Sequence, residues 1–212
     1  MTAGFAGAVS ADSESIDAKF IYQSTGDLKI TFTDTSSSTN TTINNWDWDF
    51  GDSSSHGSKN AETHTYTSAG DYTIKLTVTN TSSGTNNNIS KKITVDKIEI
   101  SSIDVSGITE PSVGNEPITS APTVSGTGVD ANSVSKITWK TNSGTSVGNN
   151  NFTYDTIYKA VFTVNASKNY KFVGTTHINI NQGAGLMSIK SDGSGEVTIT
   201  YTKTAVDPVV TE

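Results

Sequence analysis

The chain has 212 residues, a formal net charge of −7 and a hydrophobic fraction of 33%. All of its basic residues are lysine, and it lacks the arginines and basic patches with which proteins read nucleic acid, so a nucleic-acid partner is excluded. No apolar run approaches the ~20 residues of a membrane-spanning helix. Without cysteine there is no disulfide framework, thiolate metal site or thiol nucleophile.

The first fifteen residues, MTAGFAGAVSADSES, lack the basic start and the apolar stretch of a secretion signal. The segment is rich in small residues, including Gly4 and Gly7, and Phe5 is its candidate anchor. It cannot form a core of its own, but it can lie along another protein with Phe5 in a pocket. We therefore expect an arm that binds a partner subunit; a loose tail is the alternative.

Strict alternation of apolar and polar residues, typical of half-buried strands, recurs along the chain. It is clearest in DLKITFTDT (27–35), GDYTIKLTVTN (70–80), IYKAVFTVNA (157–166) and EVTITYTKT (196–204). Turn-forming clusters such as STGD and SDGSGE separate these segments. The charged fraction is only 17%, and the apolar residues are evenly spaced, which favours folded β-domains over disorder. The pattern predicts an all-β protein made of two tandem Ig-like β-sandwiches.

The stretch NNWDWDFGDSS (44–54) alternates aromatic residues with aspartates. In a strand, the aromatic side chains point to one face and Asp47 and Asp49 to the other, and Gly51 and Asp52 then form a turn. The residues expected in the two cores are Trp46, Trp48, Phe50, Tyr66, Tyr72, Leu76, Trp139 and Phe162.

Two motifs in order, WDFGD (48–52) and HTYTSAGDYTIKLTVTN (64–80), resemble the polycystic-kidney-disease (PKD) type of Ig-like domain. The resemblance runs over about residues 18–96. Ser53, where the family usually has glycine, and Ala61, where proline is common, depart from the pattern in loops. The resemblance implies an Ig-like sandwich.

The second half is similar to Ig-like repeats of bacterial and archaeal surface proteins and of phage structural proteins. The similar segments are IDVSGITEPSVGNEPIT (103–119), ITW (137–139) and FTYDTIYKAVFTVNASKNYKF (152–172). ITVDKIEISSIDV (93–105) joins the halves without glycine or proline, which predicts a short, stiff joint. We expect an arm (1–15), a PKD-like domain (16–97), a second Ig-like domain (98–206) and a C-terminal tail (207–212).

Candidate chemistry is sparse. Asp52 is a weak calcium candidate, but Asp47 and Asp49 lie on an outer strand face with no identified partner, so no catalytic residue, cofactor or metal is assigned. The histidines His56, His64 and His177 do not have ligand spacing. No serine elbow or phosphate-binding loop occurs, so we do not expect an enzyme.

These observations favour a structural display protein of a phage virion surface, a capsid decoration or head-fibre protein. Its expected partners are capsid or other virion subunits, with host surface glycans as a further candidate; neither nucleic acid nor membrane is expected. A cell-surface adhesion or carbohydrate-binding module is the alternative, and a phage tail protein the second alternative. Sugar stacking has little support, because the tryptophans alternate into the expected cores.

Overall fold

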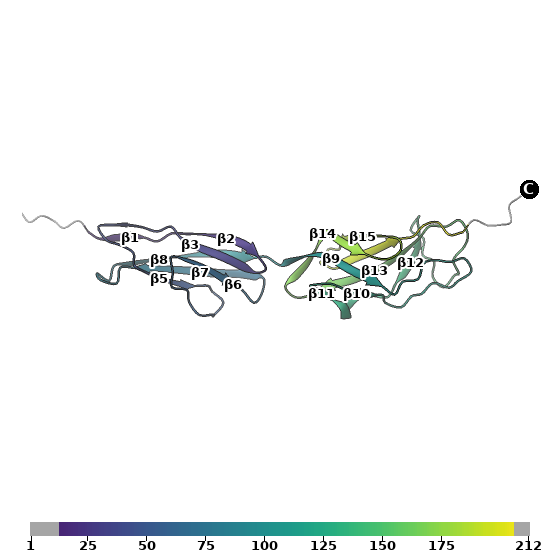
Figure 1. Ribbon diagram of the computed structural model, residues 1–212, viewed down its shortest axis with the longest axis horizontal. Helices are drawn as coiled ribbons and strands as arrows, with labels where there is room; N and C mark the ends of the chain where they lie inside the picture. Colours follow the sequence, from purple (N-terminus) through teal and green to yellow (C-terminus); the bar gives the residue numbers. More distant parts are fainter. Residues whose placement is uncertain (1–12, 206–212) are drawn as a thin grey trace, which may run out of the picture. The chain divides into compact units, whose positions relative to one another are not determined.

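The computed structural model of the protein describes residues 13–205. Contacts divide the chain between Asp96 and Lys97 into two compact units, called here the first and the second domain. Nearly every element is a β-strand (Figure 1), and within residues 13–205 the one helix is a short 3-10 turn, Ala131–Ser133 (η1). The predicted all-β fold class, with Ig-like sandwiches, is confirmed. In the same range, no helix is long and apolar enough to cross a membrane.

The first domain packs two three-stranded sheets, ordered β2-β3-β6 and β5-β7-β8, and its short strands β1 and β4 pair separately. All of these pairings are antiparallel. The strands are β1 (Ser15–Asp17), β2 (Phe20–Gly26), β3 (Lys29–Asp34), β4 (Ser37–Thr39), β5 (Asn45–Asp49), β6 (Ala61–Thr65), β7 (Gly70–Thr79) and β8 (Asn86–Val95).

The core of the first domain follows directly from the period-2 pattern of its strands. In β7, Ile74 and Leu76 are fully buried, whereas the intervening Thr73 and Lys75 are exposed. The facing sheet contributes Phe32 and other buried side chains from β2 and β3. One face of each sheet is therefore apolar and packed, and the other is wetted by hydroxyl and amino groups.

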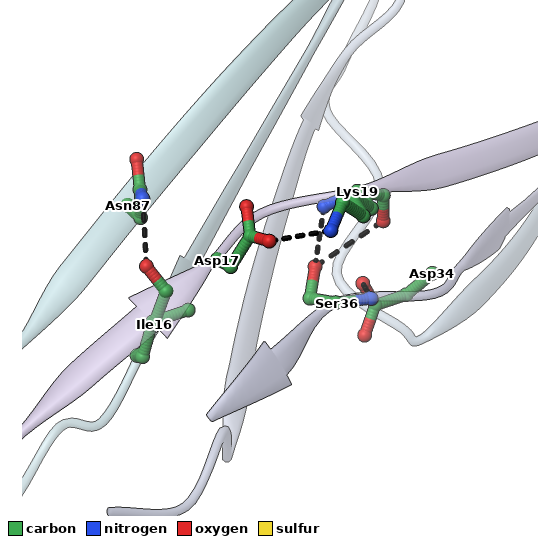
Figure 2. Close-up of polar contacts among 6 residues, drawn as sticks. All are labelled: Ile16, Asp17, Lys19, Asp34, Ser36 and Asn87. Atoms are coloured by element: carbon green, nitrogen blue, oxygen red, sulfur yellow. Dashed lines mark hydrogen bonds and ion pairs between the residues drawn. The ribbon is translucent and has the colours of Figure 1, made fainter. Parts of the chain in front are cut away.

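Polar contacts hold the start of the first domain in place. Asn87 on β8 donates from its side-chain amide to the Ile16 carbonyl at 2.7 Å (Figure 2). Ser36 accepts from the Lys19 backbone N–H at 2.9 Å and donates its hydroxyl to the Lys19 carbonyl at 3.2 Å. The Ser36 N–H in turn donates to Asp34 at 2.9 Å. The backbone just after the expected arm is thus attached to β4 and β8.

The second domain has a three-stranded sheet, β10-β9-β14, and a five-stranded sheet, β11-β13-β16-β15, in which β12 also pairs with β13. The pairing of β9 with β14 is parallel, and the other pairings are antiparallel. The strands are β9 (Ile98–Ser106), β10 (Thr123–Ser125), β11 (Val129–Asp130), β12 (Thr138–Thr141), β13 (Tyr158–Ala166), β14 (Tyr170–Asn179), β15 (Ala184–Ile189) and β16 (Gly195–Thr200).

A second apolar cluster, separate in sequence from the first, fills this domain. Its members include Ile103 and Val105 on β9, Phe162 and Val164 on β13, and Trp139 on β12. Alternate residues of β13 are buried from Tyr158 to Val164. Each domain therefore buries its own alternating strands.

Candidate functional site

The strand β5 and the loop that follows it carry the residues that the sequence singles out most strongly. Trp48 has no exposed surface, and its indole ring lies 5.3 Å from the Phe20 ring and 5.7 Å from the Phe32 ring, centroid to centroid. Its Nε1 donates to the Lys59 carbonyl at 2.8 Å. The indole thus fills the space between the two sheets and also holds the loop.

The structure places most of the expected core residues deep in the two cores. Those that are buried are Trp48, Phe50, Tyr66 and Leu76 in the first domain, and Trp139 and Phe162 in the second. The alternation of their strands is the physical reason, because it turns every second side chain inward.

Trp46 and Tyr72 are only half-buried. The Trp46 Nε1 donates to the Asp34 carboxylate at 2.8 Å, and the Tyr72 hydroxyl donates to the Ser68 carbonyl at 2.7 Å. Both side chains carry a polar group that needs a partner, and in each case the partner residue is itself only partly buried. The expectation of a core position therefore needs correction for these two: they cover the edge of the core.

Asp52 and His64 form a largely buried polar pair below the loop. The carboxylate Oδ2 lies 2.7 Å from His64 Nε2, and the side chains are 13% and 14% exposed. The imidazole stacks on Phe50 at 4.1 Å and meets the Tyr66 ring edge-on at 4.6 Å. Burial alone would raise the pKa of Asp52, but hydrogen bonds from Ser54 and His64 outweigh it and hold the pKa below its usual value.

This pairing bears directly on the calcium candidate. One Asp52 oxygen accepts from the Ser54 N–H at 3.1 Å and the other contacts His64, so protein groups already occupy the carboxylate. Within residues 13–205 no group of three or more His, Asp or Glu side chains is arranged to hold a metal ion. Asp52 and His64 act in the fold as a polar clasp between the loop and β6.

The other two aspartates of the stretch, Asp47 and Asp49, make a surface contact and a turn hydrogen bond, respectively. Asp47 is exposed and contacts His56 Nδ1 at 2.6 Å, and this hydrogen bond, with the Asp47 charge, raises the pKa of His56. Asp49 accepts from the Gly51 N–H at 2.9 Å. Gly51 has φ +74, and a Cβ there would lie 2.4 Å from the Thr73 carbonyl oxygen, so the turn requires glycine.

A hollow of about 280 Å³ opens in the second domain, where the sequence offered no candidate. It is lined by Thr109, Glu110, Asn115, Glu116, Ile118 and Phe152. The lining comes from two loops, one between β9 and β10 and the other between β12 and β13. The loops meet through the Phe152 N–H, which donates to the Asn115 carbonyl at 3.0 Å, and the Gly114 N–H, which donates to the Phe152 carbonyl at 2.9 Å.

A second, wider hollow of about 500 Å³ is mainly polar. Its lining includes Asp130, Asn165, Tyr170, Lys171 and Asp192. Tyr170 offers a partly exposed ring among carboxylate, amide and amino groups. Neither hollow could be found from the sequence, because the residues of each are scattered over segments that only the folded chain brings together.

The expected partner-binding residues Phe5, Gly4 and Gly7 lie outside the described residues. The described chain begins just after them, and Glu14 accepts from the Thr85 hydroxyl at 2.7 Å. Any change to the arm that stops before Glu14 leaves the contacts of β1 intact.

Comparison with known proteins gives a family for the first domain. The family model described as the PKD domain matches residues 12–95. The PKD1 domain of Vibrio anguillarum Epp is 30% identical, with a TM-score of 0.36, and the match covers 38% of this chain and 93% of that chain. The PKD1 domain from the Vibrio cholerae metalloprotease PrtV is 33% identical, with a TM-score of 0.36, over 39% of this chain and 98% of that chain.

A further similar structure is that of the fibronectin(III)-like modules of Clostridium thermocellum CbhA. It is 10% identical with a TM-score of 0.31, and the match covers 88% of this chain and 95% of that chain. No curated protein matches the chain.

Proposed function

Because the chain belongs to the PKD domain family through its first domain, we propose that it is a display component of a virion surface, as a capsid decoration or head-fibre protein. PKD and Ig-like domains serve non-enzymatic adhesion or structural roles, which is the broader class of this protein. Within this class of non-enzymatic adhesion or structural proteins, the proposal specifies the surface of a virion as the place where the protein acts.

The observation that carries the proposal is the architecture of the two domains. Each has a core of its own, and the outward face of a strand such as β7 carries polar residues, among them Thr73 and Lys75. Such a domain keeps its fold without a covering partner and stays soluble when exposed. The resemblance of the second half to phage structural repeats supports the virion placement.

Within this proposal, the arm anchors the protein to a capsid subunit through Phe5, with Gly4 and Gly7 allowing close approach of the backbone. The experiment compares the full chain with a Phe5→Ala variant and with a deletion of residues 1–12, which leaves Glu14 and β1 in place. Leu186→Ala is the matched control, because Leu186 is an apolar side chain exposed elsewhere.

Each protein is mixed with purified particles that lack it, and occupancy is measured after sedimentation. We expect the full chain and Leu186→Ala to decorate particles equally, and the two arm variants to lose about tenfold or more in affinity, as for an anchor residue. Arm variants that decorate particles at normal occupancy would refute the anchor. A full chain that binds no particle would refute the virion placement.

Cell-surface adhesion through glycans is the second candidate, and the wider hollow favours it. Tyr170 supplies a ring on which a sugar can stack, and Asp130, Asn165 and Asp192 supply hydrogen-bonding groups around it. A glycan array probed with the full chain and with Tyr170→Ala tests this candidate. Binding to defined glycans that is lost in the variant would favour adhesion over the virion placement.

A further inference from the structure

The smaller hollow of the second domain has an unbalanced charge. Two of its six lining residues are the exposed acids Glu110 and Glu116, and no lining residue is basic. Within residues 13–205 neither carboxylate has an ion-pair partner, whereas the nearby Asp155 is paired with Lys203 at 2.7 Å. We infer that this hollow binds a basic side chain, arginine or lysine, presented by a partner protein.

The floor of the hollow fits the carbon stem of such a side chain. Phe152 is 4% exposed and forms an apolar base, and Ile118 remains 42% exposed at the edge. Arginine and lysine lay their methylene groups along apolar surface and keep the charged end in a polar setting. An apolar lining residue together with two lining carboxylates is complementary to this kind of group.

The walls of the hollow are held in place before any partner arrives. Besides the paired backbone groups of Gly114, Asn115 and Phe152, the Asn151 side-chain amide donates to the Gly114 carbonyl at 2.8 Å. Trp139 Nε1 donates to the Ile118 carbonyl at 2.8 Å, which ties this wall to the core. A site held in this way loses little conformational freedom on binding.

The core next to this wall holds a buried hydroxyl, because the Tyr201 ring packs 5.7 Å from the Trp139 ring. Tyr201 is 3% exposed, and its hydroxyl is the one buried side-chain polar atom of the described chain that has no hydrogen-bond partner. Burial raises the pKa of Tyr201 to about 12, and the neighbouring charge of Glu110 contributes.

The inference goes beyond the proposed function, because it concerns the chemistry of a contact in the second domain and holds for either placement of the protein. A bound metal ion is a poorer fit, since no group of three acidic or histidine side chains is assembled in residues 13–205. The net charge of −7 would also favour approach of a basic partner.

The test titrates the ¹⁵N-labelled full chain with Nα-acetyl-arginine amide, and in parallel with Nα-acetyl-citrulline amide, which has the same shape without the charge. A single side chain should bind with a dissociation constant on the order of millimolar. We expect saturable shifts at the amides of Asn115, Ile118 and Phe152 and at the Tyr201 ring, and binding of the neutral probe at least about tenfold weaker.

Two variants and a matched control locate the binding. Glu110→Gln and Glu116→Gln should each weaken binding of the arginine probe by about tenfold, whereas Glu99→Gln, which changes an exposed carboxylate paired with Lys171, should not. Unchanged spectra elsewhere show that the variants fold. Equal binding of both probes, or equal weakening by Glu99→Gln, would overturn the inference, as would shifts that do not saturate.

Discussion

The two tryptophans of β5 allow a paired test of the core, because they lie on the same strand with different burial. Trp48 is fully buried between Phe20 and Phe32, and Trp46 is half-buried with its Nε1 on Asp34. We expect Trp48→Ala to lower the free energy of unfolding of the first domain by about 4 kcal/mol, within the range for large aromatic residues deleted from a core.

The expected magnitude follows from area and contacts. A buried tryptophan removes about 200 Å² from water, and at about 25 cal/mol per Å² this corresponds to about 5 kcal/mol, from which the retained Cβ is subtracted. The Lys59 carbonyl that loses its indole donor belongs to an exposed residue, so water can replace the bond at little cost. Trp46→Ala should cost less, because part of its side-chain area is already hydrated.

Hydrogen exchange in the full chain, read by mass spectrometry, measures the effect on each domain separately. Peptides from β7 report on the first domain, and peptides from β13 report on the second and serve as an internal control. We expect Trp48→Ala to accelerate exchange in β7 strongly and to leave β13 unchanged. Equal losses for the two tryptophans would refute the argument from burial, and acceleration in β13 would refute the separation of the cores.

Two further changes test the loop after β5. Gly51→Ala should destabilise the first domain by about 2–4 kcal/mol, because the added Cβ would clash with the Thr73 carbonyl oxygen. Gly26→Ala, where φ is +83 and the space around the residue is open, should cost only about 1 kcal/mol. Urea unfolding measures both variants, and equal losses of stability would contradict the clash. Asp52→Asn should destabilise the domain at neutral pH, and its difference from the wild type should shrink as the pH falls below the ordinary Asp value of 3.8, because a carboxyl with a lowered pKa stabilises the fold only while it is ionised. If the stability difference between wild type and Asp52→Asn stays constant between pH 7 and pH 2, the negative charge of Asp52 next to His64 does not contribute to stability.

The strand pattern in the sequence was sufficient to predict the fold class, and the motifs WDFGD (48–52) and HTYTSAGDYTIKLTVTN (64–80) carried the family resemblance. In β7, each apolar residue is separated from the next by one polar residue, and the period-2 rule fixes the inward face without any tertiary information. Trp46 shows the limit of that rule. Its indole nitrogen donates to Asp34, which lies on another strand, and alternation within β5 contains nothing about that partner.

Sites that depend on loops could not be predicted in the same way. Asp52 and His64 are twelve residues apart, and their pairing requires the loop after β5 to fold back on β6. The backbone bonds that hold this loop join Trp48 and Gly57, at 2.9 Å and 3.1 Å. Glu110 and Phe152 meet in the hollow only because backbone groups of Gly114 and Asn115 pair across two long loops. Hydrogen bonds between backbone groups of distant loops do not depend on a particular side-chain pattern, so the sequence alone does not predict them.

The parallel pairing of β9 with β14 has a consequence for the order of synthesis. Ile98 pairs with Tyr170, so the ribosome completes most of the second domain before β9 finds this neighbour. During that interval Ile103 and Val105 belong to an apolar strand with one edge open. The strands of the first domain pair antiparallel, and all of them have been made before β9 is finished. A nascent chain should therefore carry a closed first domain ahead of an unfinished second, and mispairing between neighbouring nascent copies should start at β9.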